Sequence, residues 1–198
     1  MQSQEATTPV ASLFSLEGNK RLMNVKPASS HDELLGLMRL LPLIFLIHDG
    51  EEIVTMSAWV ERNRHRLPDR IVALHGGRQQ FSIGVLFVFL LVIAVSVVGE
   101  RARSSRTALH IYLVGLSALF VNVWTHVGQS LVFRGYTPGI VTAVLVVLPY
   151  SAAVYREMAR ERMLDRPTLV RSLAAGLGLM ALIIPVGLTL GRLITRRR

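Results

Sequence analysis

Residues 81–99, FSIGVLFVFLLVIAVSVVG, form an apolar stretch without a charged side chain. A helix needs about 20 predominantly apolar residues, at 1.5 Å each, to cross the hydrocarbon core of a membrane. The apolar residues do not alternate with polar ones, so a half-buried strand does not fit the pattern. The stretch therefore predicts a transmembrane helix.

The composition of the whole chain agrees with this interpretation. The 198 residues are 51% hydrophobic, and the mean hydropathy of +0.44 is typical of an integral membrane protein with a single domain. The absence of cysteine excludes disulfides, thiolate metal sites and cysteine nucleophiles. The net charge of +9 comes mostly from residues between apolar runs, where lipid headgroups explain it better than nucleic acid does. We expect a protein of the bacterial cytoplasmic membrane.

Five apolar segments predict an all-α fold, a five-helix transmembrane bundle. The spans are expected at about residues 34–60, 81–99, 107–133, 138–156 and 169–191. Residues 1–31 are polar and predict a flexible tail rather than a signal peptide, and residues 32–198 predict one transmembrane helical domain. The basic residues of the expected loops divide ten to ten between the two sides, so they leave the orientation open, and the oligomeric state is open too.

Turn and helix-breaking residues refine this prediction. Thr137 is expected to cap the fourth span, with Pro138 in its first turn. Pro42, Pro149 and Pro185 lie inside expected spans. Because proline lacks an N–H group, each should bend its helix and free a carbonyl.

The first span is interrupted by the polar sequence HDGEE at residues 48–52. An ionisable group at the centre of a bilayer costs about 2.5–3.5 kcal/mol on insertion scales. Glu51 and Glu52 follow His48 by three and four residues, so the three side chains share one helical face, while Asp49 points toward another partner or a water pocket. A hydrogen bond between transmembrane helices stabilises their association by only about 0.6 kcal/mol, which is less than the insertion cost of one ionisable group. A functional site is therefore the better interpretation.

The third span carries the complementary sequence NVWTH at residues 122–126. Asn122 and His126 are four residues apart and lie on one helical face. The first and third spans run parallel, and His48, Asn122 and His126 lie at depths within about 10 Å of one another at 1.5 Å per residue. We therefore expect one cluster inside the membrane.

Two imidazoles and a carboxylate suit zinc, iron or manganese, with Asn122 or water completing the coordination. We predict His48, Glu52 and His126 as metal ligands, Glu51 as general base, and Asn122 as the group that orients a substrate oxygen or a water. The alternative is an acid–base pair that works without metal. No nucleotide-binding motif is present, so neither a nucleotide cofactor nor a nucleic-acid partner is expected.

These residues resemble a known family. LPLIFLIHDGEE (residues 41–52) is similar to the signature of the HXXEE-domain proteins, a prokaryotic membrane family, and NVWTH and YTPG (residues 136–139) match its other two features in order. The resemblance implies a multi-helix membrane protein with five functional positions: His48, Glu51, Glu52, Asn122 and His126. The site chemistry is also similar to that of emopamil-binding-type sterol isomerases, which bury His, Glu, Asn and Trp among five helices and move protons without metal, although their order and spacing differ. Trp124 beside Asn122 carries that second likeness.

The leading functional hypothesis is a membrane-embedded enzyme that acts on a membrane lipid or a lipophilic small molecule. A metal-dependent hydrolase or oxidoreductase fits the residues, and so does a metal-free isomerase. A proton-coupled transporter could use the same carboxylates as a relay. A structural membrane assembly protein is the third alternative.

Overall fold

The computed structural model describes residues 30–75 and 77–196, so the predicted tail lies almost entirely outside the described residues. The described part of the chain is all-α, as predicted, and contains no strand. Its elements are α2 (Ser30–Arg39), α3 (Leu41–Arg62), η2 (Arg64–Arg66), α4 (Asp69–His75), α5 (Arg78–Gly99), α6 (Arg106–Phe133), α7 (Ile140–Thr142), η3 (Ala143–Val147), α8 (Leu148–Arg160) and α9 (Arg166–Arg196).

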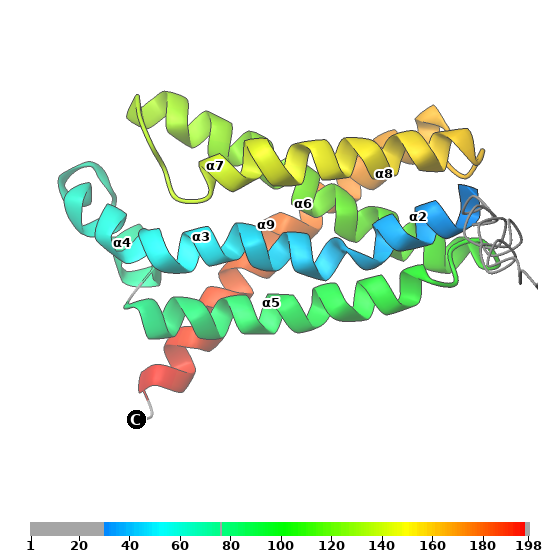
Figure 1. The fold of residues 1–198 in the computed structure, drawn as a ribbon. Helices are drawn as coiled ribbons and strands as arrows, with labels where there is room; N and C mark the ends of the chain where they lie inside the picture. The colour runs from blue at the N-terminus through cyan, green and yellow to red at the C-terminus, as the bar shows by residue number, and fades with distance from the viewer. Residues whose placement is uncertain (1–29, 76, 197–198) are drawn as a thin grey trace, which may run out of the picture.

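The long helices form a bundle in which α9 crosses the others obliquely (Figure 1). Helix α9 packs against α5 and α6, and α3 packs against α5. Glycines allow the closest of these approaches, because a Cβ atom added at Gly84 of α5 would lie 2.9 Å from the carbonyl oxygen of Gly187 in α9. The backbones of the two helices are therefore in direct contact at this crossing.

Four helices of the described chain are long and apolar enough to cross a membrane. They are Arg78–Gly99, Arg106–Phe133, Ile140–Arg160 and Arg166–Thr195. Helix α3 has 22 residues, which is enough length, but three carboxylates reduce its hydropathy, so the expected count of five spans is approximate. Many large apolar side chains on the outside of the bundle are exposed, among them Leu86, Leu90, Leu131 and Leu145. Such a surface indicates a membrane protein.

The first expected span consists of two helices that meet at Leu40, and Pro42 lies in the first turn of α3. Without an N–H group, Pro42 cannot bond the carbonyl of Met38 four residues earlier. That carbonyl instead accepts hydrogen bonds of 3.3 Å from the hydroxyls of Tyr112 and Ser96. The prediction that Pro42 frees a carbonyl is confirmed, and buried hydroxyls of other helices satisfy it.

The prediction that Thr137 caps the fourth span is wrong. Gly139 precedes α7 in a left-handed conformation, and the hydroxyl of Thr137 is buried without a hydrogen-bond partner among the described residues. The main-chain N–H of Thr142 is bonded instead by the carboxylate of Glu51, at 2.8 Å. A carboxylate from α3 thus takes the place of a local cap, in the position where the helix dipole favours negative charge.

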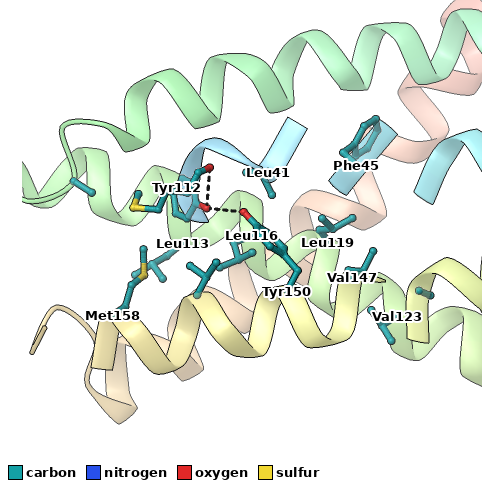
Figure 2. Close-up of a cluster of buried hydrophobic side chains, with 14 of the residues drawn as sticks. Leu41, Phe45, Tyr112, Leu113, Leu116, Leu119, Val123, Val147, Tyr150 and Met158 are labelled. Atoms are coloured by element: carbon teal, nitrogen blue, oxygen red, sulfur yellow. Dashed lines mark hydrogen bonds between the residues drawn. The ribbon is translucent and has the colours of Figure 1, made fainter. Parts of the chain in front are cut away.

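Helices α3 and α6, which carry the predicted site, share one apolar core with α8. Tyr112, Leu113 and Leu116 of α6 are fully buried, and Tyr112 bonds the hydroxyl of Tyr150 in α8 at 3.2 Å (Figure 2). The same core contains Leu41 and Phe45 of α3. Because this packing fixes α3 against α6, it also fixes the relative depth of their polar residues.

Candidate metal centre

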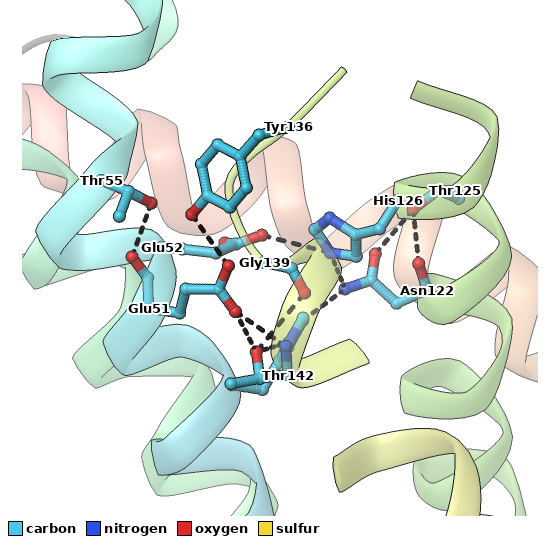
Figure 3. Close-up of polar contacts among 10 residues, drawn as sticks. Glu51, Glu52, Thr55, Asn122, Thr125, His126, Tyr136, Gly139 and Thr142 are labelled. Atoms are coloured by element: carbon cyan, nitrogen blue, oxygen red, sulfur yellow. Dashed lines mark hydrogen bonds and ion pairs between the residues drawn. The ribbon is translucent and has the colours of Figure 1, made fainter. Parts of the chain in front are cut away.

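Four of the five predicted functional residues, namely His48, Glu52, Asn122 and His126, meet in one cluster. Figure 3 shows Glu52, Asn122 and His126 of this cluster together with the fifth residue, Glu51. The amide nitrogen of Asn122 lies 3.2 Å from Nε2 of His48 and 3.0 Å from Nε2 of His126. Nε2 of His126 also lies 3.2 Å from Oε1 of Glu52. The prediction that the first and third spans bring these side chains into one cluster is therefore confirmed.

Both imidazoles are almost inaccessible to solvent. His48 is 1% exposed and His126 is 3% exposed, and their rings meet edge to face with centroids 4.8 Å apart. The four-residue spacing places Glu52 one turn after His48 on α3, and His126 one turn after Asn122 on α6. Two short helical faces are thus enough to build the cluster.

Hydrogen bonds fix the tautomer of His48. Its Nδ1 atom lies 3.1 Å from the hydroxyl of Thr142, and that hydroxyl donates to Oε2 of Glu51 at 2.6 Å. A threonine hydroxyl has one hydrogen, so Nδ1 of His48 must be the donor in their contact. The lone pair of His48 is then on Nε2, which faces Asn122.

The Asn122 amide occupies the point where the two histidines converge. With its nitrogen toward the imidazoles, the amide donates to Nε2 of His48 and lies 3.0 Å from Nε2 of His126. The hydroxyl of Thr125 lies 2.9 Å from the amide oxygen and also donates to the main-chain carbonyl of Asn122. Rotating this amide would bring its oxygen to the same place, where it could act as a further ligand.

Glu51 faces a different side of α3. Its Oε1 atom accepts the hydroxyl of Tyr136 at 2.8 Å, and its Oε2 atom accepts the main-chain N–H and the hydroxyl of Thr142. Glu51 therefore reaches His48 through Thr142, and its role as general base stays a prediction.

The loop between α6 and α7 closes over the cluster. Gly139 has a φ of +82°, and a Cβ atom added there would lie 2.6 Å from Cε1 of His126 and 2.9 Å from Oε1 of Glu52. The indole N–H of Trp59 donates to the carbonyl of Tyr136 at 2.9 Å and holds the start of this loop against α3. Nδ1 of His126 is buried near Gly139 and makes no hydrogen bond to a described residue.

A cavity of about 490 Å³ lies between α3, α5, α6 and α9, and one wall of it is polar. Asp49, Glu52, Asn122 and His126 contribute to that wall, whereas His48 and Glu51 do not line the cavity. Of the two orientations expected for Asp49, the structure has the one toward a pocket. The volume is within the range of about 300–1,000 Å³ that small-molecule sites occupy.

The cluster fits a metal ion. His48, Glu52 and His126 each offer one ligand atom, and these three atoms lie within 4.8 Å of one another. Two imidazoles and one carboxylate are the donor set of catalytic zinc sites and of non-haem iron sites, which keep an open position for substrate. Because Glu52 and His126 line the cavity, the open coordination position of such a metal could point into it.

Comparison with known proteins identifies the family. The model of the family described as "Protein of unknown function with HXXEE motif" matches residues 39–154, which is more than half of the chain. The chain belongs to the HXXEE family. In this HXXEE protein the motif letters fall on His48, Glu51 and Glu52, and the matched range also contains Asn122 and His126. No curated protein and no solved structure matches the chain.

The sequence interpretation of this HXXEE protein missed Thr142, which bonds both Glu51 and His48. No spacing rule relates residues 51 and 142, because their contact depends on how α7 packs against α3. Tyr136 entered that interpretation only as part of YTPG, and it also bonds Glu51. Because Thr137 looked like a local cap, the sequence carried no signal that a carboxylate from elsewhere would bond the start of α7.

Proposed function

We propose that this HXXEE protein is a membrane-embedded metalloenzyme. In this proposal His48, Glu52 and His126 hold a divalent zinc, iron or manganese ion, and the substrate is a lipophilic molecule in the adjacent cavity. The observation that carries the proposal is that three buried or half-buried ligand atoms lie within 4.8 Å of one another, and that two of their residues, Glu52 and His126, line that cavity.

Charge balance supports a metal cation over an empty cluster. Asp49 and Glu52 both line the cavity, and no lysine or arginine is among its described lining residues. Buried carboxylates without a compensating cation are costly, and a divalent ion would offset both. His48 is prepared for this role, because the contacts of Thr142 and Glu51 direct its Nε2 lone pair toward His126.

The metal would supply Lewis acidity at the polar wall of the cavity. The protein groups then have distinct tasks. Asn122, within 3.2 Å of both Nε2 atoms, orients a substrate oxygen or a water. Glu51 acts as a positioning residue for His48 through Thr142. Hydrolase and oxidoreductase chemistry are both compatible with this arrangement.

The membrane location is supported by the four apolar helices and by the exposed apolar side chains around them. A substrate that dissolves in the bilayer can reach a cavity between helices without crossing water. The apolar walls of the cavity, which include Val85, Val88 and Leu119, suit such a molecule.

Elemental analysis of the detergent-purified protein tests the metal proposal. We expect near-stoichiometric zinc, iron or manganese in the wild type and its loss in the His48→Ala, His126→Ala and Glu52→Gln variants. Asp49→Asn is the matched control, because Asp49 lines the same wall but is not one of the three clustered ligands. It should keep the metal.

A folded wild type that takes up no metal even after incubation with each ion would contradict the proposal. The same four variants would then test metal-free acid–base chemistry. Proton flux in liposomes that disappears in the Glu51→Gln variant would point to a carrier. If the His126→Ala variant no longer purifies as monodisperse protein, and the wild type binds neither metal nor lipid, the site has a structural role.

A further inference from the structure

The cavity is elongated along the helices. Its lining residues on α3 run from Leu41 to Val60, which is 19 residue steps or about 28 Å at 1.5 Å per residue. On α6 they run from Gly115 to Phe133, which is 18 steps or about 27 Å. The cavity therefore suits an elongated ligand that lies along the helices.

The polar groups are near the middle of this length. Asp49 follows Leu41 by eight residues and Glu52 precedes Val60 by eight, so about 12 Å of α3 lies on either side of them. A ligand that fills the cavity therefore extends in both directions from the candidate metal centre.

The two halves of the cavity differ in polarity. The half toward α2 is apolar on every wall, with Phe45 from α3, Val92 from α5 and Leu119 from α6. The half toward α4 combines apolar Met56 with polar Gln129. The α2 half thus suits a hydrocarbon tail, and the α4 half suits a moderately polar group. No described lining residue is a lysine or arginine, so the cavity has no permanently cationic side chain to neutralise a phosphate or carboxylate.

We propose that the substrate is an elongated lipid with an uncharged polar portion, bound with a hydrocarbon chain in the α2 half. Its reacting group lies beside Glu52 and His126, about 12 Å from the end of the cavity near α2. This assignment rests on the proposed function for the chemistry, but its binding geometry can be tested separately.

Native mass spectrometry with uncharged monoacylglycerols tests the assignment. The wild type should bind a fourteen-carbon chain at least tenfold more tightly than an eight-carbon chain. Val92→Trp shortens the α2 half, so it should abolish this preference. We expect the affinity for the fourteen-carbon chain to fall at least tenfold and the affinity for the eight-carbon chain to change less than threefold. Met56→Phe in the other half is the control and should weaken both chains alike. Val92→Phe replaces Val92→Trp if the larger side chain prevents folding.

Three results would overturn the assignment. They are an unchanged chain-length preference in the folded Val92 variant, equal binding of a fourteen-carbon fatty acid, and tighter binding of a sterol than of either chain. The metal content of the same samples separates the two proposals. If a wild type that takes up no metal still binds lipid according to chain length, the metalloenzyme proposal is refuted and the lipid-site proposal is supported. If the protein holds stoichiometric metal but binds no lipid, the lipid-site proposal is refuted and the metal proposal is supported.

Discussion

Glu51 accepts the hydroxyl of Thr142 at 2.6 Å, and that hydroxyl lies 3.1 Å from Nδ1 of His48. A carboxylate of α3 thus connects to an imidazole of the same helix through one residue of another helix, Thr142 of α7. The partner of the second nitrogen of a ligating histidine fixes its tautomer and orientation, and removing such a partner typically costs 10–100-fold in metal affinity.

We therefore expect Thr142→Val to weaken metal binding by about 10–100-fold, because it removes the hydroxyl and keeps the branched shape. Competition with a chelator of known affinity measures the change. Thr142→Ser keeps the hydroxyl and should stay close to the wild type. Equal affinities for the valine and serine variants would show that the contact does not orient His48.

Gly139→Ala should disrupt the site directly. The new Cβ atom would lie 2.6 Å from Cε1 of His126 and 2.9 Å from Oε1 of Glu52, at a φ of +82° that alanine rarely adopts. We expect loss of bound metal and a lower melting temperature. Gly135→Ala in the same loop is the control, because nothing lies within 4 Å of its added Cβ. If both variants bind metal like the wild type, the loop does not close over the cluster.

The hydroxyl of Tyr112 should stabilise the fold because Pro42 leaves the carbonyl of Met38 without a main-chain N–H partner. Tyr112→Phe removes a donor to the Met38 carbonyl, and we expect it to lower the free energy of unfolding by about 1 kcal/mol. Pro42→Ala restores a main-chain N–H, so Tyr112→Phe should cost less in that background. Denaturant unfolding of the four proteins of this cycle measures the coupling, and strict additivity would contradict the explanation.

The start of α9 should show a pH dependence. Hydrogen bonds from the side chain and the main-chain N–H of Thr168 hold the pKa of Asp165 below its usual value. A lowered pKa in the folded state stabilises the protein above the unfolded value, and this stabilisation is lost as the pH falls through the folded one. Asp165→Ala should therefore lower the melting temperature at neutral pH but not in acid below the folded-state pKa of Asp165. If the melting temperatures of the wild type and Asp165→Ala differ by the same amount at both pH values, the Asp165 carboxylate makes no such contribution.

Much of the candidate site could be predicted because helical periodicity and bilayer depth are both encoded locally. His48 with Glu52, and Asn122 with His126, share faces at a spacing of four, and parallel spans place them at one depth. The structure places Asn122 within 3.2 Å of both histidines, and His126 3.2 Å from Glu52. Their roles as ligands stay predictions.

The contacts of Glu51 could not be predicted in the same way. The spacing places Glu51 on the same face as His48, yet the two side chains share only Thr142. Beyond it, Glu51 bonds Tyr136 and His48 contacts Asn122. A face of an α-helix is about 100° wide, so neighbouring positions on it can meet different partners. Only the packing of the third partner, here α7, decides between them.

The break at Leu40 was missed for a related reason. Proline in an apolar run predicts a disturbance near Pro42, and the sequence does not say whether the helix bends or ends. Here it ends and restarts, because Tyr112, Tyr150 and Ser96 are available to bond the carbonyls of Leu37 and Met38. Those donors come from three other helices, and no local pattern contains them.

The π-helical turn η3 has a consequence for how this segment can vary. A π turn holds one residue more than an α turn, which shifts the helix after it by about 100°. Thr142 and Tyr150 would be about 80° apart on an uninterrupted α-helix, and the shift brings them to nearly one side, where they bond His48 and Leu37. Apolar substitutions in AVLVV would leave this alignment intact, whereas deleting a single residue would turn Thr142 away from His48. In this part of the chain, length is more constrained than composition.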